Sequence, residues 1–176
     1  MGKKKKIWDR ESKIMSSSLR KIFLTLFYSG LFPKAPGTIG TIVSLAMAML
    51  LLQYFTITNL FMASILISII AIKQINIYEK EVGAHDGSEI VIDELAGMWI
   101  ALSVANVQAD SYILALIAFV YFRLFDILKP SIIGRIDRDA PGGLGVMGDD
   151  IVAGFFAGIA TSATAYILSS YFAIIV

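Results

Sequence analysis

Two long segments of this chain contain no charged side chain, and they limit strongly what the chain can fold into. The first lies between Lys34 and Lys73, and the second runs from Ile151 to Val176. A helix that crosses a lipid bilayer needs about 20 apolar residues, so the first segment has room for two passes with a turn near 56–59. Only 16% of the residues are charged, compared with about 25% in soluble domains. The pattern predicts helices that have lipid as their solvent.

The remaining apolar segments complete the expected architecture. Two of them cover about 90–107 and 111–128, and the last begins at Asp149 and continues to the end of the chain. A shorter segment, 19–32, is expected to form a helix that lies in the membrane interface or under the bundle. We therefore predict an all-α integral membrane helical bundle of about five spans, built as a single domain over 19–176. A hydrophobic soluble bundle is the alternative.

Basic residues are placed so that they predict the orientation of this bundle. Eight of the fifteen Lys and Arg residues lie in the first 21 positions. Loops 73–89 and 129–148 also carry Lys or Arg, whereas the turns 56–59 and 105–110 and the C-terminus carry none. Since cytoplasmic loops of membrane proteins are enriched in Lys and Arg, we expect the N-terminus in the cytoplasm and the C-terminus outside.

The basic N-terminal arm, 1–18, has two interpretations. It is either a solvated tail or a segment attracted to anionic lipid, at about 1 kcal/mol for each basic residue near the surface. It is too polar for a signal peptide, which needs an apolar core soon after its basic end. The net charge of the whole chain is only +1, so we expect no nucleic-acid partner.

Five acidic residues beside the apolar segments fall at one end of the expected bundle. With the orientation above, the cytoplasmic ends of the third, fourth and fifth spans carry Asp93, Glu94, Asp126, Asp149 and Asp150. Charged groups within spans cost a few kcal/mol and usually face the bundle interior with a partner. Converging carboxylates repel one another unless cations neutralise them, and hard oxygen ligands suit Mg²⁺ or Mn²⁺. The sequence predicts a divalent-metal site at this end.

Each acid also has a simpler explanation, which the sequence leaves open. Asp149 or Asp150 alone would cap a helix N-terminus, although one cap needs only one Asp. The acids of the third span are also ordinary residues for the first turn of a helix. Asp126 follows Arg123 by three positions, so the two side chains share a helix face and are placed to form an ion pair.

Two glycine-rich segments reach the same end of the bundle. In the first, 32–45, a Pro-Gly turn precedes Thr38 and Thr41, either of which would cap the first span. The second, 140–154, places glycines before the acid pair and would allow the backbone to approach a ligand closely. Helix starts of this kind present free N–H groups to anions. Each segment alone is more simply explained as a tight loop.

Cationic side chains near the same end would complete a phosphate site. Phosphate and carboxylates repel each other, so they share a site only with metal between them. Arg123 suits bidentate phosphate recognition, and Lys34 and Lys129 add positive charge. Alternatively, Arg123 is a partner for Asp126, and Lys129 only extends from its helix end to the interface. The combination indicates metal-assisted phosphoryl chemistry at the membrane surface.

Four sequence blocks resemble the signature of a known family. They are SGLFPKAPGTIGTIVSL (29–45), EIVIDELAGMWIAL (89–102), FRLFDILKP (122–130) and GGLGVMGDDIVAG (142–154). In this order they look like the blocks of phosphatidylglycerophosphatase A, and the resemblance covers about residues 28–160. Members of that family are small integral membrane enzymes that remove the terminal phosphate of phosphatidylglycerophosphate with Mg²⁺. The chain departs from it at KPSII (129–133), where the family often has KPxPI, and we expect this to alter a loop.

The resemblance implies roles for the residues at the predicted site. The catalytic acids would be Asp93, Glu94, Asp126, Asp149 and Asp150, the metal ligands Asp93, Glu94, Asp149 and Asp150, and the phosphate contacts Thr38, Thr41, Arg123 and Lys129, beside Lys34. The expected cofactor is Mg²⁺, the expected partner an anionic phospholipid substrate, and the expected location a bacterial cytoplasmic membrane with the site facing the cytoplasm. Glu94 or Asp126 would act as the base, or an Asp as a nucleophile. The spacing leaves these alternatives and the oligomeric state open.

Other classes of protein fit the sequence less well. The chain has no cysteine and one histidine, whereas cysteine phosphatases need a thiol and histidine-based lipid phosphatases need more than one imidazole. The single histidine, His85, is expected on the surface. DRDA (137–140) resembles an Asp-x-Asp phosphatase motif but follows no apolar strand. A divalent-cation transporter that uses the same acids is the remaining alternative, and it would need polar residues deep in several spans.

Overall fold

The computed structural model describes residues 15–83 and 87–172, so that His85 and residues 1–14 of the basic arm lie outside it. The described residues form seven α-helices and no strand, which confirms the all-α prediction. The helices are α2 (Ser17–Leu24), α3 (Pro36–Leu51), α4 (Ile57–Val82), α5 (Ile92–Val104), α6 (Tyr112–Leu128), α7 (Ile132–Asp139) and α8 (Gly142–Phe172), with a short 3-10 turn, η1 (Ser29–Leu31), between the first two.

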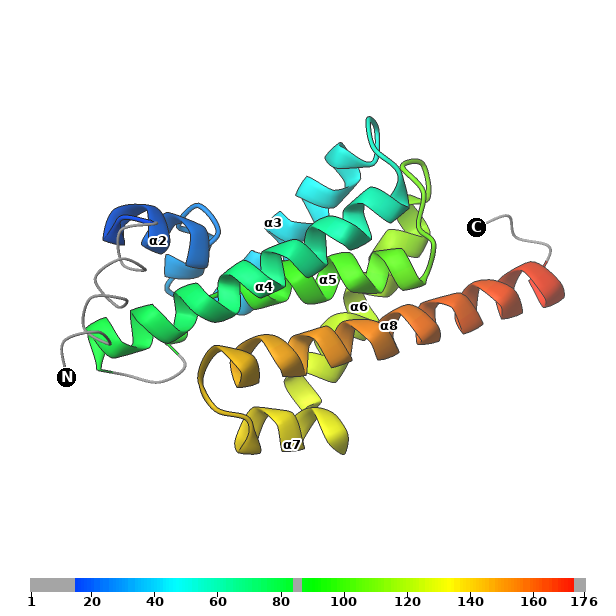
Figure 1. Cartoon of the computed structure of the whole chain (residues 1–176). Helices are drawn as coiled ribbons and strands as arrows, with labels where there is room; N and C mark the ends of the chain where they lie inside the picture. The colour runs from blue at the N-terminus through cyan, green and yellow to red at the C-terminus, as the bar shows by residue number, and fades with distance from the viewer. Residues whose placement is uncertain (1–14, 84–86, 173–176) are drawn as a thin grey trace.

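The short helix α5 lies at the centre of the bundle, and its residues from Glu94 to Leu102 are all buried. It packs most extensively on α8 and also on α4 and α3 (Figure 1). Glycines allow α5 and α8 to approach closely, because a Cβ at Gly154 would overlap the carbonyl oxygen of Gly97 and one at Gly158 would lie 2.5 Å from Val104 Cβ. This close crossing places the first turn of α5 beside the N-terminal part of α8.

Apolar side chains cover the outside of the bundle, while many buried side chains are polar. Large exposed residues include Leu50, Leu66, Ile113, Leu116, Phe155 and Tyr166. Buried hydroxyls bond within their own helices: Ser68 Oγ donates to the carbonyl oxygen of Ser64 at 2.7 Å, and Thr161 Oγ1 donates to that of Ala157 at 2.8 Å. An apolar exterior with polar groups satisfied inside is what lipid requires.

Among the described residues, two helices are long and apolar enough to cross a bilayer: Ile57–Val82 and Gly142–Ser170. Helix α3 is apolar but shorter, and α5 has 13 residues, fewer than the about 20 that a full span needs. The predicted apolar segments therefore all form helices, but the count of about five spans and the cytoplasmic N-terminus stay predictions.

The glycine-rich segment 140–154 is not the loop that the sequence suggested. Helix α8 begins at Gly142, seven residues before the expected start of the fifth span at Asp149. Packing on α4 explains the difference: the Gly143 N–H donates to Asn76 Oδ1 at 2.9 Å, and a Cβ at Gly143 would lie 2.5 Å from the carbonyl oxygen of Ile72. Contact with a neighbouring helix here outweighs the low helix propensity of glycine.

Two further local predictions need correction. The helix expected over 19–32 is only α2, because Leu26, Phe27 and Tyr28 adopt left-handed backbone conformations before η1. The loop expected over 129–148 contains α7, which lies along the N-terminal part of α8 in Figure 1. Both features depend on contacts with other helices, which local sequence patterns do not report.

Helix α2 is attached to the end of α4 by a buried arginine. The Arg20 side chain is only 1% exposed, its Nη1 donates to Glu81 Oε2 at 2.5 Å, and its Nε donates to Gln74 Oε1 at 3.1 Å. The Val91 N–H also donates to the carbonyl oxygen of Leu24 at 2.9 Å. The arginine contacts join α2 to α4, and the backbone contact joins α2 to the segment that leads into α5.

Candidate active site

A polar cavity of about 240 Å³ opens at the end of the bundle where α3, α5 and α8 begin and α6 ends. Its walls also include α7 and the segment that precedes α5. The lining residues are Pro36, Gly37, Gly87, Ser88, Ile90, Asp93, Glu94, Asp126, Lys129, Asp137, Val146, Asp149 and Asp150. The structure thus brings together all five acids that the sequence singled out.

Three of these acids are close enough to hold one metal ion. One carboxylate oxygen each of Asp93, Glu94 and Asp150 lies within 4.8 Å of the others. The second oxygen of Glu94, Oε2, is buried and has no hydrogen-bond partner among the described residues. A buried carboxylate oxygen without a hydrogen-bond partner is unfavourable, and an all-oxygen donor set suits Mg²⁺ or Mn²⁺. The residues present therefore fit the expected divalent ion.

Helix α5 supplies two of these acids from its first turn. Asp93 Oδ1 accepts a hydrogen bond from the Glu94 N–H at 3.0 Å, so one oxygen of Asp93 also satisfies a free donor of the helix start. Glu94 is only 9% exposed. The role of a first-turn acid thus accounts for Asp93, but it does not account for the burial of the Glu94 carboxylate.

Helix α8 supplies Asp149 and Asp150 from its interior rather than from its N-terminus. Both lie two turns after Gly142, so the explanation that they cap the helix is wrong. Both side chains are buried, and Asp149 Oδ1 has no hydrogen-bond partner among the described residues. At Gly97 a Cβ would lie 2.6 Å from the carbonyl oxygen of Asp150, so a glycine there lets α8 bring this acid against α5.

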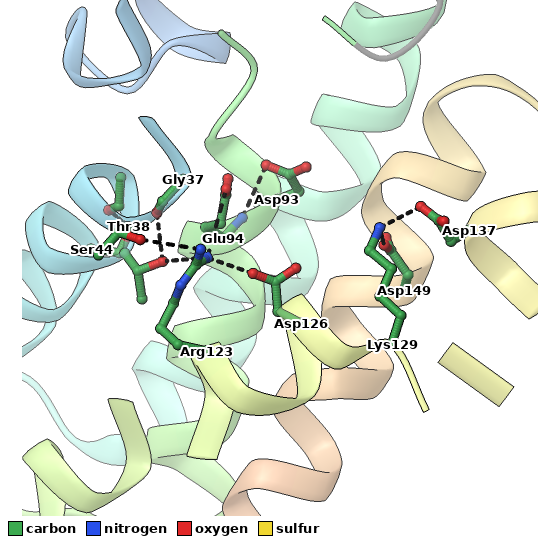
Figure 2. A network of polar contacts seen from close by, with 12 residues as sticks. Gly37, Thr38, Ser44, Asp93, Glu94, Arg123, Asp126, Lys129, Asp137 and Asp149 are labelled. Atoms are coloured by element: carbon green, nitrogen blue, oxygen red, sulfur yellow. Dashed lines mark hydrogen bonds and ion pairs between the residues drawn. The ribbon is translucent and has the colours of Figure 1, made fainter. Parts of the chain in front are cut away.

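Arg123 belongs to α6, and its guanidinium extends toward α3, next to Asp126 and Glu94 (Figure 2). Nη1 donates to Asp126 Oδ2 at 2.5 Å, which confirms the expected ion pair, and lies 4.0 Å from Glu94 Oε1. The same guanidinium donates to the hydroxyls of Thr38 and Thr41 at 3.3 Å. Arg123 therefore holds the last turn of α6 to the first turns of α3.

The two threonines do not cap α3, contrary to the sequence prediction. The cap residue is Ala35, in a left-handed conformation and without a side-chain hydrogen bond. Thr41 is fully buried, and its hydroxyl donates to the carbonyl oxygen of Gly37 at 2.8 Å. Thr38, Thr41 and Arg123 are absent from the cavity lining above, and Lys34 is exposed. Direct phosphate contact by these four residues stays a prediction.

Lys129 is the cation that reaches the cavity. It follows α6 in a left-handed conformation, and its ammonium donates to Asp149 Oδ2 at 2.7 Å and to Asp137 (Figure 2). Desolvation alone would lower the pKa of Lys129, but these hydrogen bonds and the two carboxylate charges outweigh it and raise the pKa above its ordinary value. Lys129 is therefore suited to act as a permanent positive charge and not as a general acid.

Asp137 is a cavity residue that the sequence analysis did not include. In the sequence it stands out only as part of the Asp-x-Asp motif at 137–140. The amphipathic pattern of 132–139, in which Ile133 is buried while Arg135 and Arg138 are exposed, is the signal that indicates a helix there.

Comparison with known proteins agrees with this geometry. The family model for phosphatidylglycerophosphatase A matches residues 22–165. The chain is 36% identical over 146 residues to a protein named phosphatidylglycerophosphatase A from Escherichia coli K12, with 82% of each chain covered. It is 34% identical over 140 residues to one from Haemophilus influenzae, with 80% of this chain and 85% of the relative covered. The chain belongs to the phosphatidylglycerophosphatase A family.

A third relative has a different name. A putative phosphatidylinositol-3-phosphatase from Bacteroides thetaiotaomicron is 32% identical over 148 residues, with 82% of this chain and 92% of the relative covered. No solved structure matches the chain. Membership of the phosphatidylglycerophosphatase A family makes the protein an enzyme of the phosphatase class, and the match includes every residue that lines the cavity.

Proposed function

We propose that this protein is a Mg²⁺-dependent lipid phosphatase that converts phosphatidylglycerophosphate to phosphatidylglycerol and phosphate at the cytoplasmic face of a bacterial inner membrane. Membership of the phosphatidylglycerophosphatase A family supports the substrate. The observation that supports the mechanism is the group formed by half-buried Asp93 and buried Glu94 and Asp150 in a polar cavity, where Glu94 Oε2 has no hydrogen-bond partner among the described residues.

Asp93, Glu94 and Asp150 would hold the ion, with Asp149 beside them. A bound Mg²⁺ neutralises charge on phosphoryl oxygens and lowers the pKa of water. Without it, a phosphate group would meet the negative charge of the cavity acids, so the same residues that bind the ion repel the substrate in its absence.

Lys129 supplies the fixed positive charge for the terminal phosphate. Phosphoryl transfer depends mostly on positioning and on stabilising charge on the phosphoryl oxygens. Besides Asp137, which pairs with Lys129, two carboxylates of the cavity lie outside the triad that would hold the ion, Asp126 and Asp149. Either is placed to accept the proton of the attacking water. Each has one oxygen held by a cation: Asp126 Oδ2 accepts a hydrogen bond from Arg123, and Asp149 Oδ2 accepts one from Lys129.

The membrane location follows from the surface of the bundle. Two helices have the length and composition of spans, and large apolar side chains are exposed along α3, α4, α6 and α8. The cavity lies at the end of the bundle that receives the basic loops of the chain, and the distribution of Lys and Arg supports a cytoplasmic location for this end. In this arrangement the acyl chains of a phospholipid stay in the bilayer while its headgroup reaches the acids.

The test is release of inorganic phosphate from phosphatidylglycerophosphate by the detergent-purified protein. We expect release with Mg²⁺, none after chelation, and none from Asp150→Asn with Mg²⁺ present. Phosphatidylinositol 3-phosphate is the comparison substrate, because one relative is named for it. If the protein released phosphate only from the inositol lipid, the proposed substrate would be wrong. If it released none from either lipid with any divalent ion, the proposed activity would be wrong.

A further inference from the structure

Lys129 stands at a junction of three helices. It is the C-cap of α6, with φ 43° and ψ 54°, and the chain passes from it through Pro130 and Ser131 into α7. Its side chain is 32% exposed and turns to α7 and α8, where it meets one carboxylate from each. Carboxylates from two helices thus hold the flexible lysine side chain at the wall of the cavity.

The ammonium group has capacity left for a ligand. A lysine ammonium has three N–H donors, and the two carboxylates, Asp137 Oδ1 and Asp149 Oδ2, account for two of them. The third is available to an oxygen atom in the cavity. A phosphate oxygen is the acceptor that the proposed reaction supplies.

The two carboxylates that pair with Lys129 differ in their distance from the expected metal site. Asp149 is buried next to the acids that would hold the ion, and its Oδ1 is unpaired among the described residues. A cation bound there would share the negative charge of Asp149 and weaken its attraction for Lys129. Asp137 belongs to another helix and lies outside the triad of Asp93, Glu94 and Asp150, so its attraction for Lys129 persists when the ion is bound.

The packing of helix α7 places Asp137 beside Lys129. It is anchored by Ile133, which is 1% exposed. Its next residue, Gly134, packs on the backbone of Lys129: a Cβ there would lie 2.6 Å from the Lys129 carbonyl oxygen. The close approach leaves Asp137, one turn later, beside the ammonium.

We propose that Asp137 is a positioning residue that keeps the ammonium of Lys129 at the phosphate-binding end of the cavity when the ion is bound. This inference rests on the proposed phosphatase function. It assigns α7 a role in substrate binding, although no residue of α7 belongs to the triad of Asp93, Glu94 and Asp150.

Kinetics in mixed micelles test the proposal. We compare wild type with Asp137→Asn, with Asp137→Glu, and with Asp139→Asn, a matched control in which the altered acid is exposed on the same helix. We expect Asp137→Asn to raise the KM for phosphatidylglycerophosphate about tenfold, the usual effect of one lost charge-assisted contact, with a smaller change in kcat and the same Mg²⁺ dependence. Asp137→Glu should recover most of the loss, and Asp139→Asn should behave as wild type.

A chemical measurement separates this proposal from the proposed activity. Purified wild type and Asp137→Asn are treated with an amine-acylating reagent in the presence of Mg²⁺, and mass spectrometry follows Lys129, with the exposed Lys34 as internal reference. Release of Lys129 from Asp137 should raise its labelling relative to Lys34 several-fold. Wild-type KM and unchanged labelling in Asp137→Asn would overturn the positioning role while leaving the phosphatase function intact. If wild type were inactive on both lipids, the labelling alone would decide.

Discussion

Glu94 and Asp150 belong to different helices, yet a carboxylate oxygen of one lies within 4.8 Å of a carboxylate oxygen of the other. The close crossing of α5 and α8 at Gly97 and Gly154 produces this proximity. Two buried carboxylates at this distance repel each other, and the repulsion is stronger than it would be in bulk water. Such a pair is stable when a cation lies between its members.

Asp150→Asn therefore tests the metal site directly. The variant should lose at least about a hundredfold in phosphate release. It should also lose the thermal stabilisation by Mg²⁺, which for the wild type amounts to several degrees when the ion is in large excess over its dissociation constant. Thermal denaturation in detergent with and without Mg²⁺ measures this without an assay of activity. The control is Asp110→Asn, an exposed acid in the loop before α6. An Asp150→Asn protein that Mg²⁺ stabilised as much as wild type would contradict the assignment.

Gly37→Ala should inactivate the enzyme through contact with a catalytic acid. A Cβ at this position would overlap Glu94 Oε1 and lie 3.4 Å from Arg123 Nη2. The methyl group must displace the carboxylate, so we expect at least a tenfold loss of kcat, since small misplacements of reacting groups cost up to about a hundredfold. Gly83→Ala is the control: it adds a methyl group that meets no atom within 4 Å, although its φ of 75° costs some stability. Equal activity of the two variants would show that Glu94 needs no fixed position.

Arg123→Lys should lower both activity and stability, although the charge is kept. The guanidinium contacts Thr38, Thr41 and Asp126 at once, and a lysine ammonium lacks the planar fork that allows this. We expect a loss of about tenfold in kcat and a melting temperature lower by a few degrees. Phosphate release and thermal denaturation in detergent measure the two effects. A variant with a higher KM but unchanged kcat and stability would instead favour direct contact between Arg123 and phosphate.

Arg20→Met should destabilise the fold without altering the chemistry of the site. The substitution removes the ion pair between Arg20 and Glu81. It also leaves Gln74, which is 6% exposed, without the hydrogen bond that Arg20 Nε donates to it. Breaking such a buried pair costs about 3–5 kcal/mol, and the partial exposure of Glu81 places the expected loss near the lower end of that range. Thermal denaturation in detergent checks this, with Lys21→Met, an exposed neighbour, as the control. Activity per folded molecule at low temperature should remain near that of wild type.

The sequence by itself determined the all-helical class and the group of acids. Uncharged segments as long as 35–72 and 151–176 cannot be placed in water as separate loops, because their apolar side chains must be buried or covered by lipid. Helices satisfy their own backbone hydrogen bonds in such surroundings. Carboxylates that border the apolar segments then fall toward one end of the bundle, so the convergence of Asp93, Glu94, Asp126, Asp149 and Asp150 was predictable and is seen in the cavity.

Only the tertiary structure decided how the cationic and small residues are used. Local patterns predicted that Thr38 or Thr41 caps a helix and that the glycines before Asp149 form a loop. In the structure Thr41 holds Arg123, and the glycines belong to α8, where Gly143 packs on α4. The partners in each case lie on helices distant in sequence. Hydrogen bonds and close packing between helices outweigh local preferences of a few tenths to about 1 kcal/mol per residue, so the position of these residues is set by the assembled bundle.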